Sequence, residues 1–143
     1  IFQYLLGNTD FSPILGSKDE CCHNYALFGT DGAPLLAIPY DFDMSGFVNT
    51  PYARPESGLG IENVRQRLYQ GFCENNQFVK ASVSEFIQAR DTLYALVANQ
   101  TALEKTVRQR LAGYMDEFYE TIGDSQRVEQ EILERCITMT GSG

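Results

Sequence analysis

Three short polar segments near the start of the chain carry side chains suited to metal-dependent chemistry. In chain order they are Gly7-Asn8-Thr9-Asp10, His23-Asn24 and Pro39-Tyr40-Asp41-Phe42-Asp43. The first and third segments supply the carboxylates of Asp10, Asp41 and Asp43, and the second supplies the amide of Asn24. Carboxylate and amide oxygens bind divalent cations such as Mg²⁺, and an acid beside them orients the acceptor in phosphoryl transfer.

The acid pair Asp41 and Asp43 carries the strongest of these signals. Both residues follow an apolar stretch that we expect to be a strand. Side chains alternate between the two faces of a strand, so the two acids are expected on one side and Phe42 on the other. Neighbouring carboxylates repel each other unless they are solvated or bound to a cation. This pattern favours an Mg²⁺ site. Asn8 or Asp10 could equally be a helix cap or an Asx-turn residue, and for the segment taken alone the capping role is the better explanation.

A β-hairpin is predicted to position the second and third polar segments. Residues 25–29 and 34–40 are apolar enough for two strands, and Asp31-Gly32 between them is a hairpin turn signal. Asn24 precedes the first strand and Asp41 follows the second. Because the strands of a hairpin pair antiparallel, we expect Asn24 to lie close to Asp41.

The rest of the chain is predicted to be mainly helical, which makes the fold class α+β. The predicted architecture is a small β-hairpin bearing the site plus a bundle of about four helices, with residues 1–60 as the site-bearing region and residues 61–143 as the helical region. The individual expectations are a helix end at 1–7, a polar loop at 8–24, irregular chain at 41–60, a short helix at 61–70, helical chain at 75–99 divided near Ser82 or Ser84, and helices at 102–121 and 125–138, the last one capped by Gly123-Asp124-Ser125.

Composition limits the class of partner. The 143 residues suit one domain with its own core, and the net charge of −8 argues against nucleic acid as a partner. No apolar run is long enough for a membrane span. The chain begins at Ile1 and its first six residues resemble a helix already under way. We therefore expect it to be a fragment of a longer protein.

The four cysteines do not decide between an exported and a cytoplasmic protein. No C-x-x-C pair is present, so a structural zinc site is not expected. A disulfide from Cys21 or Cys22 to Cys73 would favour an exported protein, whereas free thiols would fit a cytoplasmic one.

The order of the three polar segments resembles the C-terminal lobe of protein-kinase-like folds. The combination of Gly-Asn-Thr-Asp, His-Asn and Pro-Tyr-Asp-Phe-Asp is similar to atypical kinase-like families of the CotH spore-coat and HipA type, which occur in bacteria. The resemblance covers residues 1–46 and extends to the rest only in general helical character. It implies an enzyme that uses ATP and Mg²⁺ to phosphorylate an acceptor of unknown identity.

The resemblance also implies a role for each residue. Asp10 would be the catalytic acid, Asn24 the amide that binds the metal and nucleotide, and Asp41 the main metal-bridging carboxylate with Asp43 beside it. Two features depart from the family pattern. The spacing from Asp10 to Asn24 is longer than usual, so residues 13–22 are expected to loop out. A Gly-rich loop and a strand-borne Lys for the phosphates are absent, so the N-terminal lobe would have to precede Ile1, and the fragment alone would be inactive.

Two alternatives remain open. The chain is compatible with a non-catalytic kinase-like scaffold or a helical interaction module. Strand-Asp-x-Asp also opens haloacid-dehalogenase phosphatases, with Asp41 as the nucleophile and Asp43 as the acid/base. That fold requires several later parallel strands, and the sequence after Asp43 offers mainly helices.

Overall fold

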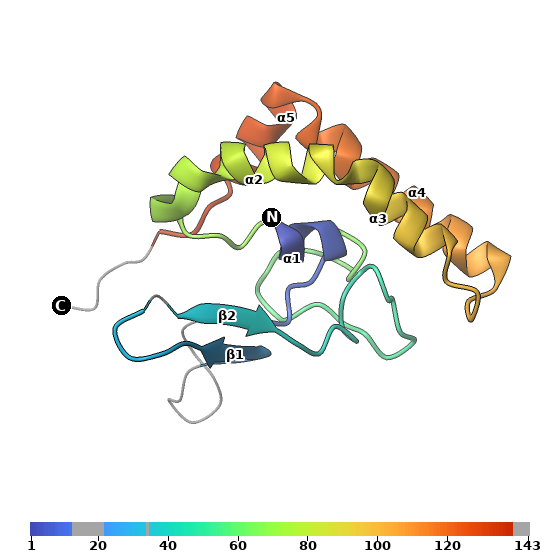
Figure 1. Cartoon of the computed structure of the whole chain (residues 1–143), viewed down its shortest axis with the longest axis horizontal. Helices are drawn as coiled ribbons and strands as arrows, with labels where there is room; N and C mark the ends of the chain where they lie inside the picture. The colour runs from blue at the N-terminus through green and yellow to red at the C-terminus, as the bar shows by residue number, and fades with distance from the viewer. Residues whose placement is uncertain (13–21, 34, 139–143) are drawn as a thin grey trace. The chain divides into compact units, whose positions relative to one another are not determined.

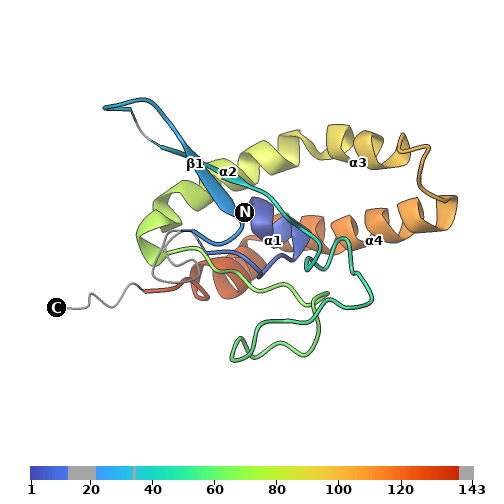
Figure 2. The same cartoon turned by 90° about the horizontal axis from the view of Figure 1, so that it is seen from below.

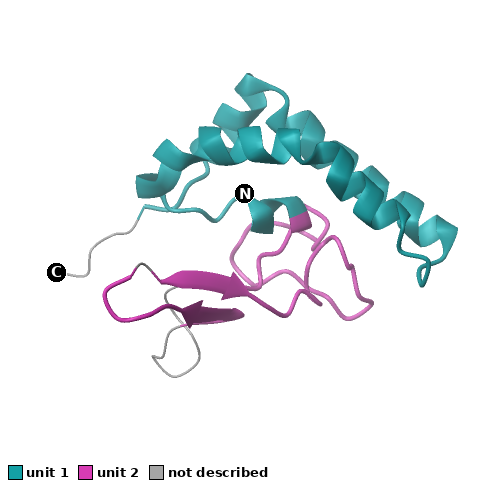
Figure 3. Ribbon diagram, in the orientation of Figure 1, with its two compact units in different colours: residues 1–5, 68–143 teal, residues 6–67 magenta. Residues whose placement is uncertain are grey.

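The structure of the chain is a computed structural model that describes residues 1–12, 22–33 and 35–138. The chain divides into two compact units, which are described separately (Figure 3). Unit 1 comprises residues 1–5 and 68–143, and unit 2 comprises residues 6–67. Helices and an antiparallel strand pair are both present, which confirms the α+β class.

Unit 2 contains the predicted hairpin. Strand β1 (Tyr25–Phe28) pairs antiparallel with β2 (Leu36–Pro39), and the Asp31-Gly32 turn lies in the connection between them (Figure 1). Phe28 lies opposite Leu36 in the register. The rest of the described part of this unit is mostly irregular chain, as expected for residues 41–60.

The short helix expected at residues 61–70 is wrong. Side chains in this segment bond to nearby backbone N–H groups, and the chain forms turns in place of a helix. Gln66 Oε1 accepts from the N–H groups of Glu62 and Asn63, and Asn63 Oδ1 accepts from Arg65 N–H at 3.0 Å. Such local side-chain bonds compete directly with helix formation.

Unit 1 is built from helices. Helix α1 (Phe2–Leu6) lies at the start of the chain, and its residues up to Leu5 belong to this unit. The later helices are α2 (Asn76–Gln88), α3 (Arg90–Ala98), α4 (Lys105–Ile122) and α5 (Ser125–Val128), with a 3-10 turn η2 (Cys73–Asn75) before α2 and a π-helical turn η3 (Glu129–Leu133) after α5. Helices α3 and α4 run side by side and are joined by residues 99–104 (Figures 1 and 2).

Two helix boundaries differ from the sequence-based expectation. The division between α2 and α3 lies at Ala89 and not near Ser82 or Ser84. Ser84 Oγ accepts a hydrogen bond from Gln88 Nε2 within α2 and does not begin a new helix. The expected helix at 125–138 starts correctly, with Asp124 as its N-cap, but regular helical structure ends at Leu133. Ile137 instead exchanges backbone hydrogen bonds with the segment 71–73.

An aromatic cluster on Phe118 forms the centre of unit 1. The Phe118 side chain is fully buried, and its ring lies 5.6 Å from Phe86, 5.1 Å from Tyr119 and 6.2 Å from Tyr4, measured between centroids. Tilted and edge-on contacts at these distances are the favoured geometry for aromatic pairs. The cluster joins α1, α2 and α4 into one core.

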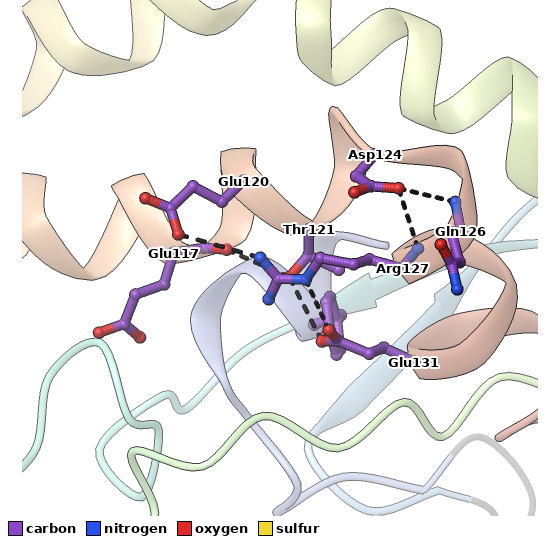
Figure 4. Close-up of polar contacts among 8 residues, drawn as sticks. Glu117, Glu120, Thr121, Asp124, Gln126, Arg127 and Glu131 are labelled. Atoms are coloured by element: carbon purple, nitrogen blue, oxygen red, sulfur yellow. Dashed lines mark hydrogen bonds and ion pairs between the residues drawn. The ribbon is translucent and has the colours of Figure 1, made fainter.

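A polar network centred on Glu131 connects α5 and η3 to α1 and α4 by hydrogen bonds (Figure 4). The Glu131 carboxylate accepts hydrogen bonds from Arg127 Nε at 2.7 Å, Tyr4 Oη at 3.0 Å and Thr121 Oγ1 at 3.3 Å. Partial burial by itself would raise the pKa of Glu131, but the hydrogen bonds from Arg127 and Tyr4 outweigh it and lower the pKa below the ordinary glutamate value.

This lowered pKa predicts an acid-dependent loss of stability. A carboxyl group with a lower pKa in the folded state contributes its full stabilisation above its unfolded pKa, about 4.3, and loses it as the pH falls through the folded value. Because the Glu131 side chain is 38% exposed, we expect at most about 1 kcal/mol from it. Glu131→Gln should therefore lower the free energy of unfolding near neutral pH. In chemical unfolding at a series of pH values, the variant should also lose less stability than the parent as the pH falls into the acid range. The exposed Glu134→Gln is the matched control, and equal curves for the two variants would contradict the prediction.

The expected disulfide from Cys21 or Cys22 to Cys73 is wrong, since Cys73 is bonded to Cys136. The backbone pairing of Phe72 with Ile137 brings the two neighbouring cysteines together. Cys21 lies outside the described residues. No cysteine of the described ranges carries a free thiol.

Removal of the Cys73–Cys136 bond should weaken the folded state strongly. The bond closes a loop with a sequence separation of 63 residues, for which the chain-entropy relation gives about 4 kcal/mol. The double variant Cys73→Ala/Cys136→Ala should unfold at clearly lower denaturant concentration than the parent. The parent treated with a thiol reductant should move in the same direction. An unchanged midpoint in both experiments would show that this bond does not form in solution.

Candidate functional site

Asp10 is held in a constrained turn directly after the first helix. Gly7, at φ 58°, ends α1 in the left-handed conformation that favours glycine. Asn8 is almost fully buried, and its Oδ1 accepts the backbone N–H of Asp10 at 3.0 Å. Asn8, and not Asp10, therefore makes the Asx turn, and the Asp10 carboxylate is left available for other contacts.

Asn24 and His23 both contact Asp10. Asn24 Nδ2 donates to the backbone carbonyl of Asp10 at 2.7 Å and to Asp10 Oδ2 at 3.1 Å, while His23 Nε2 lies 2.9 Å from Asp10 Oδ1. Reciprocal backbone bonds between Ser12 and His23 bring the two segments together across the intervening residues. Each carboxylate oxygen of Asp10 thus has its own partner, which fixes the orientation of the group.

The third polar segment is joined to the first two by backbone hydrogen bonds. Tyr40 N–H donates to Asn24 O at 3.0 Å, so the hairpin places Asn24 beside the residue that precedes Asp41. Gly46 N–H donates to Gly7 O at 3.0 Å, which ties the chain after Asp43 to the end of α1. All three polar segments therefore belong to one hydrogen-bonded assembly within unit 2.

Asp41 presents an exposed carboxylate at the end of the hairpin. Its φ is 57°, so the chain leaves the extended conformation here, and the strand alternation expected to carry Asp41 and Asp43 does not apply. Asn24 also has a left-handed φ, of 55°. Asn and Asp enter this region more easily than other non-glycine residues. Within the described ranges, the Asp41 side chain makes no hydrogen bond and no ion pair.

Asp43 has partners of its own. Its Oδ2 accepts the Tyr52 hydroxyl at 2.9 Å, and its backbone carbonyl accepts Thr50 Oγ1 at 3.1 Å. The hydrogen bond to Asp43 raises the pKa of Tyr52, with smaller contributions that include the negative charge of Asp41. Both acids therefore act electrostatically on the same tyrosine.

The donor set has the chemistry that a hard cation requires. Asn24 makes both of its contacts with Asp10 through Nδ2. The amide oxygen of Asn24 is therefore the atom that could face a metal. An amide oxygen and an exposed carboxylate are typical Mg²⁺ ligands. Among the described residues, no group of three or more His, Cys, Asp or Glu side chains is arranged to hold a metal.

Sequence reasoning did not select His23 or Tyr52 as site residues. His23 contacts Asp10 only because Ser12 pairs with residue 23, and this pairing has no signature in the sequence. Its position next to Asn24 was the one available signal. Tyr52 reaches Asp43 across irregular chain, where neither strand nor helix periodicity gives information.

Comparison with protein-family models, with curated proteins and with solved structures finds no match to this chain. In the described part of the chain, no helix has the length and apolar character to cross a membrane.

Proposed function

We propose that the intact protein catalyses ATP- and Mg²⁺-dependent phosphoryl transfer, and that this chain forms a region similar to a kinase C-terminal lobe. The observation that carries the proposal is the double contact of the Asn24 amide with the backbone and side chain of Asp10. It joins an acid to a metal-binding amide and holds both in a fixed orientation, which is what transfer to a positioned acceptor requires.

Each residue has a role that follows from its surroundings. Asp10, oriented by its two partners, would accept the proton of the acceptor hydroxyl. Asn24 Oδ1 and the exposed Asp41 carboxylate would hold Mg²⁺, which neutralises phosphate charge when bound. Asp43 would add negative charge beside Asp41 while it remains bonded to Tyr52. The sequence gives no chemical signature of the acceptor.

The nucleotide-binding elements are expected outside this chain. Neither a Gly-rich loop nor a strand lysine for the phosphates is present in the sequence. We infer that they are supplied by another part of the intact protein. The 143-residue chain alone should therefore show no transferase activity.

Asp10→Asn tests the assignment of the acid. The substitution is isosteric and keeps the backbone contact from Asn24, so the cluster should persist and Mg-ATP affinity should stay near that of the parent. Loss of the proton acceptor should lower turnover by about 100-fold or more. The assay measures ADP release and nucleotide affinity on the intact protein, with the hairpin-turn variant Asp31→Asn as control. Retained turnover would show that Asp10 has another role.

The hairpin supports a second candidate function, which is a non-catalytic module that binds a protein partner. Phe28, Leu36 and Ile38 lie on one face of the sheet, and each is at least 48% exposed. A two-stranded sheet is marginally stable unless another surface covers it. Nucleotide binding without turnover, together with stable capture of a partner by this face, would favour the module.

A further inference from the structure

A shallow groove lies between α3 and α4 in unit 1. Its volume is about 470 Å³, within the range of small-molecule sites. Its apolar lining comes from α3 and α4, and polar residues of α4 complete it. The apolar residues are Tyr94, Ala95, Val97, Ala98 and Ala112, and the polar ones are Lys105, Arg108 and Gln109. Helices α3 and α4 run side by side (Figure 2). The small side chains of the alanines leave the space between these helices open.

Two cations line the end of this groove near the connection between the helices. Lys105 and Arg108 belong to the first turn of α4. Arg108 Nη1 donates to the backbone carbonyls of Gln100 and Leu103, which holds the guanidinium in place without neutralising it. Among the described residues, neither cation forms an ion pair with a carboxylate. In a chain of net charge −8, this is a local excess of positive charge beside an apolar surface.

We propose that the groove binds a medium-chain carboxylate, an anionic amphiphile with an unbranched alkyl tail. The carboxylate lies against Lys105 and Arg108, and the tail covers the alanines toward Tyr94. From Lys105 to Ala112 the groove follows seven residues of α4, about 10 Å at the helical rise, which suits a tail of medium length. The chemistry is complementary at both ends, since the cations attract the head and the apolar floor removes the tail from water. This proposal does not depend on phosphoryl transfer.

The test is a calorimetric titration of decanoate, below its micelle concentration, into the intact protein. The groove-filling variant Ala98→Leu and the charge-reversing variant Lys105→Glu are compared with Ala81→Leu and Lys80→Glu, which make the same changes at exposed positions of α2. Glutamate suits the first turn of a helix, so Lys105→Glu should not impair folding. Circular dichroism checks that all four variants remain folded.

We expect saturable binding that Ala98→Leu and Lys105→Glu each weaken by about tenfold or more, and that the α2 controls leave unchanged. Decanol, which lacks the charge, should bind the parent more weakly than decanoate. Absence of saturable binding, or weakening by the control variants to the same degree, would overturn the proposal. Binding of an acidic helical peptide that Ala98→Leu blocks, without decanoate binding, would also overturn it and identify the groove as a protein-docking site.

Discussion

Asp41→Asn should abolish the binding of Mg-ATP to the intact protein. Asp41 carries the exposed carboxylate of the site, and within the described residues it has no hydrogen bond or ion pair that would compete with a metal. Its removal takes away a negatively charged ligand for Mg²⁺, the cation that would offset the charge of the phosphates. Metal–phosphate interactions are worth several kcal/mol, and about 1.4 kcal/mol corresponds to a factor of ten, so we expect a loss of at least about 100-fold.

The Asp41 variant is informative because it should leave the fold intact. Asp41 has a left-handed φ of 57°, and asparagine tolerates that region at least as well as aspartate. Asp31→Asn, in the hairpin turn, removes the same charge at a distance from the site and serves as the control. Calorimetric titration measures both variants with and without Mg²⁺. Equal Mg-ATP affinity for the parent and Asp41→Asn would contradict the metal assignment.

Phe118→Ala should cause a large loss of folding stability in unit 1. Phe118 is 0% exposed and contacts three aromatic rings from three helices. Truncation of a buried phenylalanine typically costs about 3–5 kcal/mol, because contacts are lost and a cavity remains. That cost is comparable with the whole stability of many domains. We expect a melting temperature lower by roughly 10 °C or more.

Phe78→Ala provides the matched comparison for Phe118. Phe78 lies on α2 and is 59% exposed, so the same atoms are removed with little loss of burial. Its melting temperature, measured by circular dichroism, should stay within a few degrees of the parent. Equal destabilisation of the two variants would show that the aromatic cluster is not the core of unit 1.

Local signals in the sequence predicted the hairpin and the longest helix. The apolar runs on either side of Asp31-Gly32 predicted the hairpin, and the helical spacing of apolar residues predicted α4. The helix predicted at residues 61–70 is not present. The side chains of Gln66 and Asn63 there accept hydrogen bonds from nearby backbone N–H groups. Side-chain competition of this kind depends on rotamers, which residue spacing does not encode.

Some contacts among the proposed site residues could be predicted from the sequence, and others could not. The predicted hairpin brings Asn24 near Asp41, and the N–H of the neighbouring Tyr40 donates to Asn24 O at 3.0 Å. The contact between Asn24 and Asp10 could not be derived, because it depends on the pairing of Ser12 with His23. The Cys73–Cys136 bond was missed for the same reason, since it follows from a long-range backbone bridge at Phe72. Long-range pairings of this kind have no local signature.

The most direct test of the proposed site is a crystal structure of the intact protein with Mg²⁺ and a non-hydrolysable ATP analogue. We expect Mg²⁺ beside the phosphates, with Asn24 Oδ1 and an Asp41 carboxylate oxygen among its ligands. Asp10 should lie beside the terminal phosphate and keep its contact with Asn24. A metal–nucleotide complex bound elsewhere, or Asn24 and Asp41 turned away from each other around an empty site, would contradict the account.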